Sequence, residues 1–335
     1  MSDNHKKTQE VLKPEIKPEN TGVLSEELKS IQEKYRQLII SLNENAMNSI
    51  PFNLMEAYPD TDNIETLKEQ VDDLKKCLDS FRPLSPAHAE NLRQAFDTEY
   101  IYDSNRIEGN SLTLQETDLV IREGLTIGGK PLKDHLEAIN HKDALEFVRE
   151  LAQGQQEITE SILLDLHGMI LRGIDQTNAG RYRRDRVRIS GSQYICPNPL
   201  KVPDLMRGYF QQYQIEKNKI HPVVVAAEMH RKLVVIHPFI DGNGRTARLI
   251  MNLILLQNGY PIANISGDKN NRREYYNSLE KSHVENDDTD FIKFILKTEK
   301  KSLLKYLDMM EPDIEHGKGG YYLEKIRPFL KGLSS

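Results

Sequence analysis

The chain has 335 residues, of which 45 are basic and 51 acidic, so its formal net charge is −6. This balance argues against a protein whose main task is to coat nucleic acid or an anionic membrane. No apolar run is long enough to cross a membrane, and Cys77 and Cys196, the only cysteines, lie too far apart for a metal-ligand motif. We therefore expect a cytoplasmic protein with no nucleic-acid or membrane partner, no disulfide scaffold and no zinc site.

Residues 1–23 are rich in Lys, Glu and Pro and carry few apolar side chains, which predicts a disordered tail. Residues 24–100 form an N-terminal helical region with two segments, 24–42 and 64–81, in which apolar residues recur at the period of an amphipathic helix. The second segment could form a short coiled coil. It holds too few heptads, however, so a helix packed on its own domain is favoured.

A third helix is predicted from Ser85, which is followed by Pro86, to Gly109, because these residue types favour helix starts and stops. The pattern changes over 187–197, where apolar and arginine residues alternate and a Gly-Ser pair follows. This spacing predicts a β-hairpin. Helical patterns resume after it and continue into a C-terminal helical segment over 301–335, so we expect a mainly α fold.

The stretch HPFIDGNGRTAR places an imidazole, a carboxylate, an amide and two arginines between two apolar segments. Gly242 and Gly244 lie at the start of a predicted helix, where unpaired backbone N–H groups and the helix dipole bind anions. Arg245 and Arg248 lie on one face of that helix, within reach of the same polyphosphate. The stretch therefore predicts a phosphate site.

Asp241 beside such a site would repel phosphates, and Mg²⁺ resolves this because it takes one carboxylate and several phosphate oxygens. His237 is the candidate to remove a proton from an attacking hydroxyl, because imidazoles titrate near neutrality. The stretch also fits the dinucleotide pattern G-x-G-x-x-A, with Asp268 as the ribose-binding acid. No alternating series of strands and helices surrounds it, so phosphate-centred transfer chemistry is favoured.

At every specified position this stretch resembles the signature motif of the Fic (filamentation induced by cAMP) family, written HPFx[D/E]GNGRxxR. The resemblance covers roughly residues 100–300 and implies a helical catalytic core over 161–300 with a β-hairpin flap at 187–197. Most characterised members transfer AMP from ATP to a protein hydroxyl. Gly244 favours this activity, because the branch that phosphorylates its targets carries a lysine at that position.

The resemblance also implies a role for each motif residue. His237 would be the base that activates a target hydroxyl, and Asp241 would hold Mg²⁺ between the α- and β-phosphates of ATP. The other implied contacts are an anion hole, two arginines that neutralise the pyrophosphate and a tyrosine pair at the adenine: Gly242, Asn243 and Gly244; Arg245 and Arg248; Tyr275 and Tyr276. Where several relatives carry Asn, this chain has His283.

The stretch SNRIEGN resembles the family's inhibitory motif, [S/T]xxxE[G/N], and residues 101–160 would form the inhibitory helix and linking helices. In relatives the glutamate, here Glu108, pairs with the second arginine, here Arg248, and occupies the place of the ATP γ-phosphate. An Arg–carboxylate pair in a dry pocket is strong. Arg248 therefore cannot bind Glu108 and ATP productively at once.

Other polar side chains have simpler interpretations. Four further histidines lie in no metal-ligand pattern and are expected to be structural: His135, His141, His167 and His230. An arginine cluster is interpreted as the solvated face of the hairpin: Arg181, Arg183, Arg184, Arg186 and Arg188. A target or nucleotide contact by Arg184 is the alternative. His283 and the pair Asp287–Asp288 are expected at the surface.

The sequence thus predicts a mainly α protein with a Fic-type core and flap, which transfers AMP from Mg²⁺–ATP to a protein hydroxyl and is inhibited by Glu108. The flap would bind an unidentified target by adding a short strand, and self-modification is one outcome. Two alternatives stay open: a regulatory nucleotide-binding protein that docks through its N-terminal helices, and removal of AMP by a water that Glu108 positions. Formation of a homodimer also stays open.

Overall fold

The computed structural model describes residues 21–44 and 57–330. The chain divides into two compact units, one formed by its two ends and one formed by Asn53–Glu311. The tail predicted for residues 1–23 lies outside the described residues except for its last three, which already belong to a helix. All the sites discussed below lie in the larger unit.

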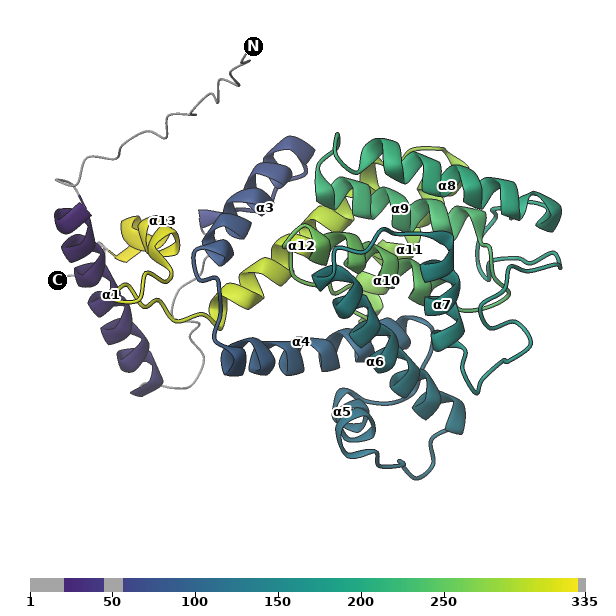
Figure 1. Cartoon of the computed structure of the whole chain (residues 1–335), viewed down its shortest axis with the longest axis horizontal. Coiled ribbons are helices and arrows are strands. Elements are labelled where there is room, and N and C mark those ends of the chain that lie inside the picture. Colours follow the sequence, from purple (N-terminus) through teal and green to yellow (C-terminus); the bar gives the residue numbers. More distant parts are fainter. Residues whose placement is uncertain (1–20, 45–56, 331–335) are drawn as a thin grey trace, which may run out of the picture. The chain divides into compact units, whose positions relative to one another are not determined.

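The smaller unit pairs α1 (Thr21–Glu44) with α13 (Gly320–Leu330) (Figure 1). Tyr35 of α1 is buried and meets the ring of Tyr322 edge to face, with centroids 6.2 Å apart. The helix predicted for 24–42 is therefore confirmed, and Tyr35 of its apolar stripe packs against α13.

The larger unit is built around α10 (Asn243–Gln257) (Figure 1). Its other α-helices are α3 (Ile64–Asp79), α4 (Pro86–Ile107), α5 (Leu114–Glu123), α6 (Leu132–Gln153), α7 (Glu160–Ile170), α8 (Val202–Glu216), α9 (Pro222–Ile236), α11 (Lys269–Val284) and α12 (Thr289–Asp308). Helix α10 is buried from Arg245 to Leu255, and its buried residues include the polar side chains Arg245, Arg248 and Asn252 as well as apolar ones. Helices α4, α6, α7 and α9 pack against it, so the polar motif at its start is held at the core.

The second amphipathic stripe forms α3. Its side chains Leu67, Val71 and Leu74 are fully buried, and the helix packs along α12 of the same unit. The interpretation of 64–81 as a helix packed on its own domain is therefore confirmed.

Helix α4 begins and ends where its sequence predicts. The Ser85 hydroxyl caps the first turn, and Pro86 follows at a position where its missing N–H costs nothing. Beyond the end of the helix, Gly109 has φ +98°, a conformation that favours glycine. This end leaves Glu108 as the C-terminal cap of α4.

The mainly α prediction is confirmed: the described residues contain no sheet, and their isolated β-bridge joins Asp313 and Lys318. The hairpin predicted for 187–197 is present only as a chain reversal. The N–H of Ser192 donates to the carbonyl of Ile189 (3.2 Å) across the turn, and no strand ladder follows. A two-stranded hairpin is marginal by itself, and no third strand lies beside it in the described part of the chain.

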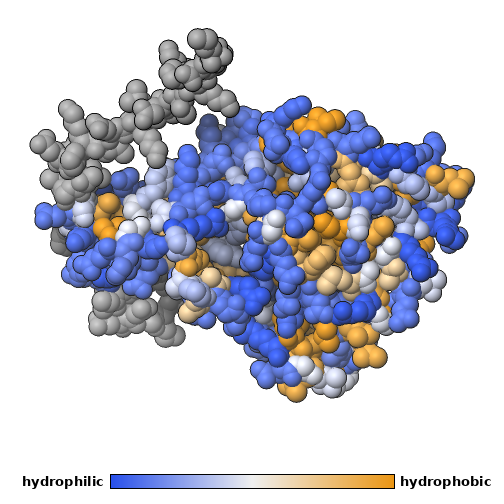
Figure 2. Space-filling view, in the orientation of Figure 1, coloured by the Kyte–Doolittle hydropathy of each residue, from blue (hydrophilic) through white to orange (hydrophobic). Residues whose placement is uncertain are grey.

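Hydrophilic residues cover most of the face shown in Figure 2, in keeping with a chain in which 29% of residues are charged. Within the described ranges, no helix combines the length and the apolar character that a membrane crossing requires.

Glu299 of α12 is inaccessible to solvent, and neither of its carboxylate oxygens has a hydrogen-bond partner in the described part of the chain. Burial raises the pKa of this carboxyl well above its ordinary value. The folded chain therefore keeps a proton that the unfolded chain loses above pH ~4.3, and stability falls as the pH rises through this window. We predict that Glu299→Gln raises the melting temperature near neutral pH, and that its advantage shrinks toward about pH 4.

Calorimetric melting of both proteins across this pH range measures the effect. Glu150→Gln on the exposed side of α6 is the matched control and should show no such pH dependence. An advantage of equal size at both ends of the range would contradict the prediction, because it could not come from ionisation of Glu299.

Candidate active site

The stretch HPFIDGNGRTAR connects α9 to α10. His237 follows α9 in the left-handed region, with φ 49° and ψ 60°, and Gly242 precedes α10 with φ 78°. The side-chain amide of Asn243 closes the loop: it accepts from the N–H of Phe239 and donates to the carbonyl of the same residue, both at 3.0 Å. The side chain expected in an anion hole is thus held by the loop through its oxygen and one of its two N–H donors.

His167 of α7 supports this loop. Its ring stacks on Phe239, with centroids 3.6 Å apart. Its Nε2 lies 3.0 Å from the carbonyl oxygen of Asp241, and its Nδ1 accepts from the N–H of Gly180 (3.0 Å). Burial lowers the pKa of His167 to about 4, so the neutral ring keeps one donor and one acceptor for these partners. The structural role predicted for His167 is confirmed.

The imidazole of His237 is arranged to accept a proton. Its Nδ1 lies 3.2 Å from the carbonyl oxygen of Val234, which assigns the ring proton to Nδ1 and leaves a lone pair on Nε2. Burial lowers the pKa of His237, and the positive charge of Arg183 adds to this effect. The carboxylates of Glu108 and Asp241 oppose both. The ring is therefore neutral at physiological pH, as a general base requires.

No side chain caps the first turn of α10. Its free N–H groups and the positive end of the helix dipole therefore favour an anion. Glu108 supplies one: a Cβ atom on Gly244 would lie only 2.4 Å from Oε1 of Glu108, so the carboxylate rests directly on the glycine. A side chain at position 244 would collide with it. While Glu108 pairs with Arg248, only a glycine fits at this position without displacing the carboxylate.

Arg248, one turn further along α10, is 1% exposed and binds the end of α4. Its Nη2 donates to Oε1 of Glu108 (2.7 Å) and to the carbonyl of Ser104 (2.9 Å), and its Nε donates to the Ser104 hydroxyl (2.8 Å). Burial alone would lower the pKa of Arg248, but the charge of Glu108 reverses this and raises it. The ion pair that the resemblance implies is present, and Ser104 and Glu108 reach one guanidinium because they lie four residues apart on one helix face.

The two tyrosines expected at the adenine differ in exposure. Tyr275 is 1% exposed, and its hydroxyl lies 3.4 Å from Nη1 of Arg248 and 3.1 Å from Nε2 of His230. Tyr275 therefore supports the arginine, and His230 supports Tyr275 in turn. Tyr276 is 41% exposed, and the guanidinium of Arg272 lies 5.6 Å from its ring centroid. Of the two, Tyr276 has the ring that a bound base can reach.

Arg245 is held by a second carboxylate, which the sequence interpretation missed. Its Nη1 lies 2.9 Å from Oε1 of Glu137 in α6, and both side chains are buried. Nη2 of Arg245 also lies 3.6 Å from Oδ1 of Asp241. The two arginines expected to share one polyphosphate therefore face different acids: Glu137 and Asp241 for Arg245, and Glu108 for Arg248. The sequence signal for Glu137 is its spacing of four residues from His141, which is also buried, on the inner face of α6.

A cavity of about 410 Å³ opens beside these groups, within the usual range for a ligand pocket. Glu108, His237 and Gly244 all line it. Residues 189–192 of the predicted flap also line it, together with Tyr276 and other residues of α11. The cavity thus brings together the base, the start of α10 and the loop expected to bind a target.

His283 of α11 also lines this cavity and is half-buried, so its predicted surface position holds only in part. Its Nε2 is buried without a hydrogen-bond partner in the described residues, and burial lowers its pKa to about 4. The loop before α8 covers it, with the ring of Tyr194 at 5.2 Å between centroids. Asp287 and Asp288 remain partly exposed, as expected. Sequence alone did not reveal that a loop would fold over this turn of α11.

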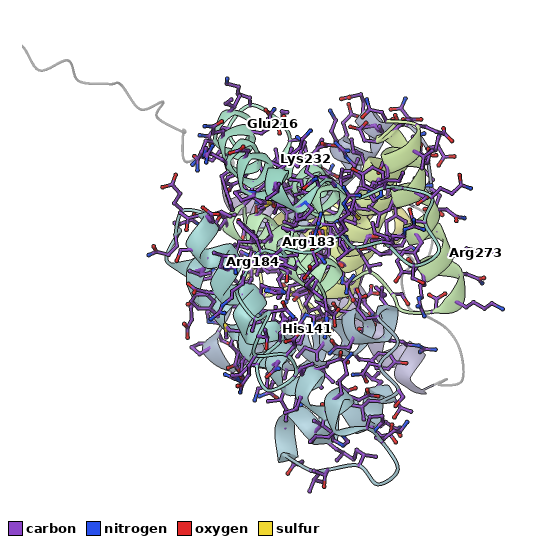
Figure 3. All side chains as sticks on the ribbon, turned by 90° about the vertical axis from the view of Figure 1, so that its right-hand side faces the viewer. His141, Arg183, Arg184, Glu216, Lys232 and Arg273 are labelled. Carbon is purple, nitrogen blue, oxygen red and sulfur yellow. The ribbon has the colours of Figure 1, made fainter. Side chains whose placement is uncertain are left out.

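The prediction that all five arginines of the cluster are solvated is wrong for Arg183. The other members of the cluster are exposed, as predicted: Arg181, Arg184, Arg186 and Arg188. Arg183 is only 3% exposed, and its guanidinium donates to three backbone carbonyls. Figure 3 labels Arg183 beside the exposed Arg184, and Arg273 of α11 extends outward at the edge of the view. Packing of the loop against α9 takes one arginine of the cluster inside.

Asp241 has a half-exposed carboxylate, whose Oδ1 accepts from the N–H of Gly242 (2.6 Å). Across the described ranges, no group of three or more His, Cys, Asp and Glu side chains is placed to hold a metal ion. A divalent cation at Asp241 would take its other ligands from phosphate oxygens and water, which is the usual coordination of Mg²⁺ at phosphoryl sites.

Known proteins resemble this chain in fold and in sequence. A sequence model of the Fic/DOC family matches residues 157–255, from the beginning of α7 to the last turn of α10. A solved portion of Fic-1 from C. elegans is similar with a TM-score of 0.66 and 30% identity, over 73% of this chain and 72% of that one. A Fic domain containing signaling protein from Bacteroides thetaiotaomicron is similar with a TM-score of 0.64 and 30% identity, over 74% and 96%. The chain belongs to the Fic/DOC family.

Curated relatives of this Fic/DOC chain carry the name protein adenylyltransferase Fic. That of Drosophila grimshawi is 34% identical over 249 residues, and that of Drosophila mojavensis is 37% identical over 230 residues. The alignments cover 73% and 67% of this chain but 50% and 45% of those proteins. The chain thus spans about half the length of the curated relatives it matches.

Ser104 is predicted to stabilise the buried guanidinium of this Fic/DOC chain. Ser104→Ala removes the hydroxyl that accepts from Nε of Arg248 and leaves a buried charged donor unpaired. We expect a loss of about 1–3 kcal/mol in the free energy of unfolding, measured by urea denaturation. Ser161→Ala on the exposed side of α7 should change it by less than about 0.5 kcal/mol. Equal effects of the two substitutions would show that Nε does not depend on Ser104.

Proposed function

We propose that this chain is a protein adenylyltransferase, which transfers AMP from ATP to the hydroxyl of a protein side chain, and that Glu108 inhibits it. The observation that carries the proposal is one cavity lined by the neutral His237, by the uncapped start of α10 and by the carboxylate that pairs with Arg248. The names of the curated relatives support the same activity.

The chemistry follows from these positions. ATP would bind with its phosphates at the start of α10, where N–H groups and the helix dipole favour negative charge. Once Glu108 moves away, Arg248 can bind the phosphate tail with the guanidinium fork that holds the carboxylate. Nε2 of His237 takes the proton of the attacking hydroxyl, whose oxygen bonds to the α-phosphorus. The bond from the α-phosphorus to the bridging oxygen breaks, and pyrophosphate leaves.

We propose Mg²⁺ as the metal, held by the half-exposed carboxylate of Asp241. When bound, it would neutralise phosphate charge and so ease the departure of pyrophosphate. The residues fit this ion: one carboxylate stands beside a phosphate site, and the described residues hold no cluster of three ligands that would bind a metal by itself. A cation that arrives with ATP suits such a site.

Inhibition would follow from competition for one position. The carboxylate of Glu108 covers Gly244 and occupies Arg248, so a triphosphate cannot reach either group without displacing it. The Glu108 side chain is 31% exposed and lies at the end of α4, beside a glycine in a left-handed conformation. It can therefore move away without disruption of the core.

We predict that Glu108→Gly raises ATP turnover and self-modification on the order of tenfold or more, within the usual range of coupling between exclusive states. The physical reason is that Arg248 and the start of α10 become free for phosphates. Radiolabelled ATP measures turnover, and mass spectrometry of the intact variant detects the added AMP.

The double variant Glu108→Gly with His237→Ala is the control, since it opens the same site but lacks the base. It should bind ATP and transfer no AMP. A Glu108→Gly protein that is no more active than the unaltered chain would count against inhibition by Glu108.

Substitution of Asp241 tests the proposed role of the metal. In the Glu108→Gly protein, Asp241→Ala should lower AMP transfer by about two orders of magnitude, because the charge stabilisation from a bound cation is worth several kcal/mol. Chelation with EDTA should stop transfer, and Mg²⁺ titrated without ATP should give no measurable heat of binding. Tight binding of Mg²⁺ alone would contradict a cation that arrives with the nucleotide.

Removal of AMP from a modified protein is the second candidate function. The observation in its favour is that Glu108 and His237 line the same cavity, where a carboxylate can position a water. The unaltered chain, added to self-modified Glu108→Gly protein, would release the label if removal dominates. ATP binding without AMP transfer, even in the Glu108→Gly protein, would favour the regulatory binding protein instead.

The protein target is proposed to dock on the loop 187–197. This loop has no strand ladder of its own, so its main-chain groups can pair with an added strand. Ile195 on the loop is 87% exposed and Leu200 just after it is 86% exposed, and both offer apolar contacts to a partner. Arg188 on the loop and Arg186 just before it are exposed and would favour an acidic segment.

A further inference from the structure

Arg183 lies between α7 and the loop 187–197, and no carboxylate pairs with it in the described ranges. Its guanidinium donates only to backbone carbonyl oxygens: Nε to His237 (2.7 Å), Nη1 to Asp185 (2.9 Å) and Nη2 to Pro197 (2.7 Å). A buried guanidinium is costly unless its donors are satisfied, so these three carbonyls fix its position.

The first of these bonds concerns the backbone of His237. Its φ of 49° lies in the left-handed region, which is costly for a residue other than glycine and persists only where the surroundings impose it. The Arg183 side chain contacts this backbone through Nε, and the main-chain N–H of Arg183 donates to the carbonyl of the next residue, Pro238 (2.9 Å). The direction of the imidazole therefore depends on Arg183.

The other two bonds join the ends of the loop. Asp185 comes just before it and Pro197 closes it, and the guanidinium bridges the two. At the tip of the loop, the Ser192 hydroxyl and the N–H of Gln193 (2.8 Å) donate to the carboxylate of Glu280 in α11. The loop is thus held at its base by Arg183 and at its tip by α11.

From this geometry we propose that Arg183 is a positioning residue, which holds the imidazole of His237 and the loop 187–197 in one register, so that a hydroxyl on a docked segment meets Nε2. The inference rests on the proposed AMP transfer. Arg183 acts through these two elements and does not take part in the chemistry itself. Lysine cannot replace it, because an ammonium lacks the fork that reaches three carbonyls at once.

The charge of Arg183 also acts on His237. It adds to burial in lowering the pKa of the imidazole. The other charged groups that face the ring are Glu108 of α4 and Asp241 of the loop, whose carboxylates raise the pKa. His283 of α11 also faces it and is neutral at physiological pH. Loss of the positive charge at position 183 therefore raises the pKa of His237, whereas lysine keeps the charge.

The test uses the Glu108→Gly protein as parent. Arg183→Lys and Arg183→Met are compared with Arg181→Lys and Arg181→Met, the same changes at an exposed arginine. Both Arg183 variants should lower kcat for AMP transfer by roughly ten- to a hundredfold, because small misplacement of reacting groups costs this much. The KM for ATP should stay within about twofold of the parent value, since the phosphate site on α10 is unchanged.

The pH profile separates positioning from general stabilisation. The acid limb of kcat/KM against pH should move to higher pH in Arg183→Met and stay in place in Arg183→Lys. A residue that only stabilised the fold would leave this limb unmoved in both variants. If Arg183→Met does not fold, the kcat and the hydrogen exchange of Arg183→Lys carry the test in place of the pH profile.

Hydrogen exchange gives a readout that needs no activity. Peptides that span 185–197 and the backbone of His237 should exchange faster in the Arg183 variants than in the Arg181 variants. Unchanged exchange, or equal kcat in Arg183→Lys and Arg181→Lys, would overturn the inference. A parent protein that transfers no AMP would refute the proposed function, and the exchange comparison would still decide whether Arg183 couples the loop to His237.

Discussion

The site depends on the need of one buried guanidinium for an anion. Arg248 lies on a helix that is buried on every side, so it cannot turn toward water when its partner leaves. An unpaired charge in such a place is strongly unfavourable, and the uncapped start of α10 adds to the demand. Either the carboxylate of Glu108 or the phosphates of a nucleotide must satisfy both. The feature that makes the site fit for ATP is therefore the same feature that makes it open to inhibition.

The second ion pair explains how Glu108 can move without loss of the segment that carries it. Glu137 pairs with Arg245, and its other oxygen accepts a hydrogen bond from the side chain of Asn110 (3.0 Å), two residues beyond Glu108. This contact ties the chain after α4 to α6 and α10, and Glu137 is not among the residues that line the cavity. Displacement of Glu108 leaves the contact intact, so the competing carboxylate stays close to its position.

The sequence predicted the features that depend on interactions between residues close together in the chain. Ser85 and Pro86 fix a helix start by their own chemistry, and the motif at α10 keeps its role because glycines and a helix start act over a few residues. It could not predict which arginine of RYRRDRVR goes inside, because Arg183 is chosen by carbonyls of segments far along the chain. The prediction of strands over 187–197 failed because it also depended on distant segments. Alternation of side chains indicates two strands, but it does not tell whether a third strand lies beside them to stabilise the pair.

His237, the proposed base, and Glu108, the proposed inhibitor, are held by different parts of the fold. His237 is fixed by Val234 of its own helix and by Arg183, and neither residue lies on α4, which carries Glu108. Movement of Glu108 therefore leaves the hydrogen bonds of the imidazole in place. It also removes a carboxylate that raises the pKa of His237, and the phosphates that replace it at Arg248 bring negative charge back to the same place. The inhibited site thus already contains the base in its working state, and release changes only which anion Arg248 binds.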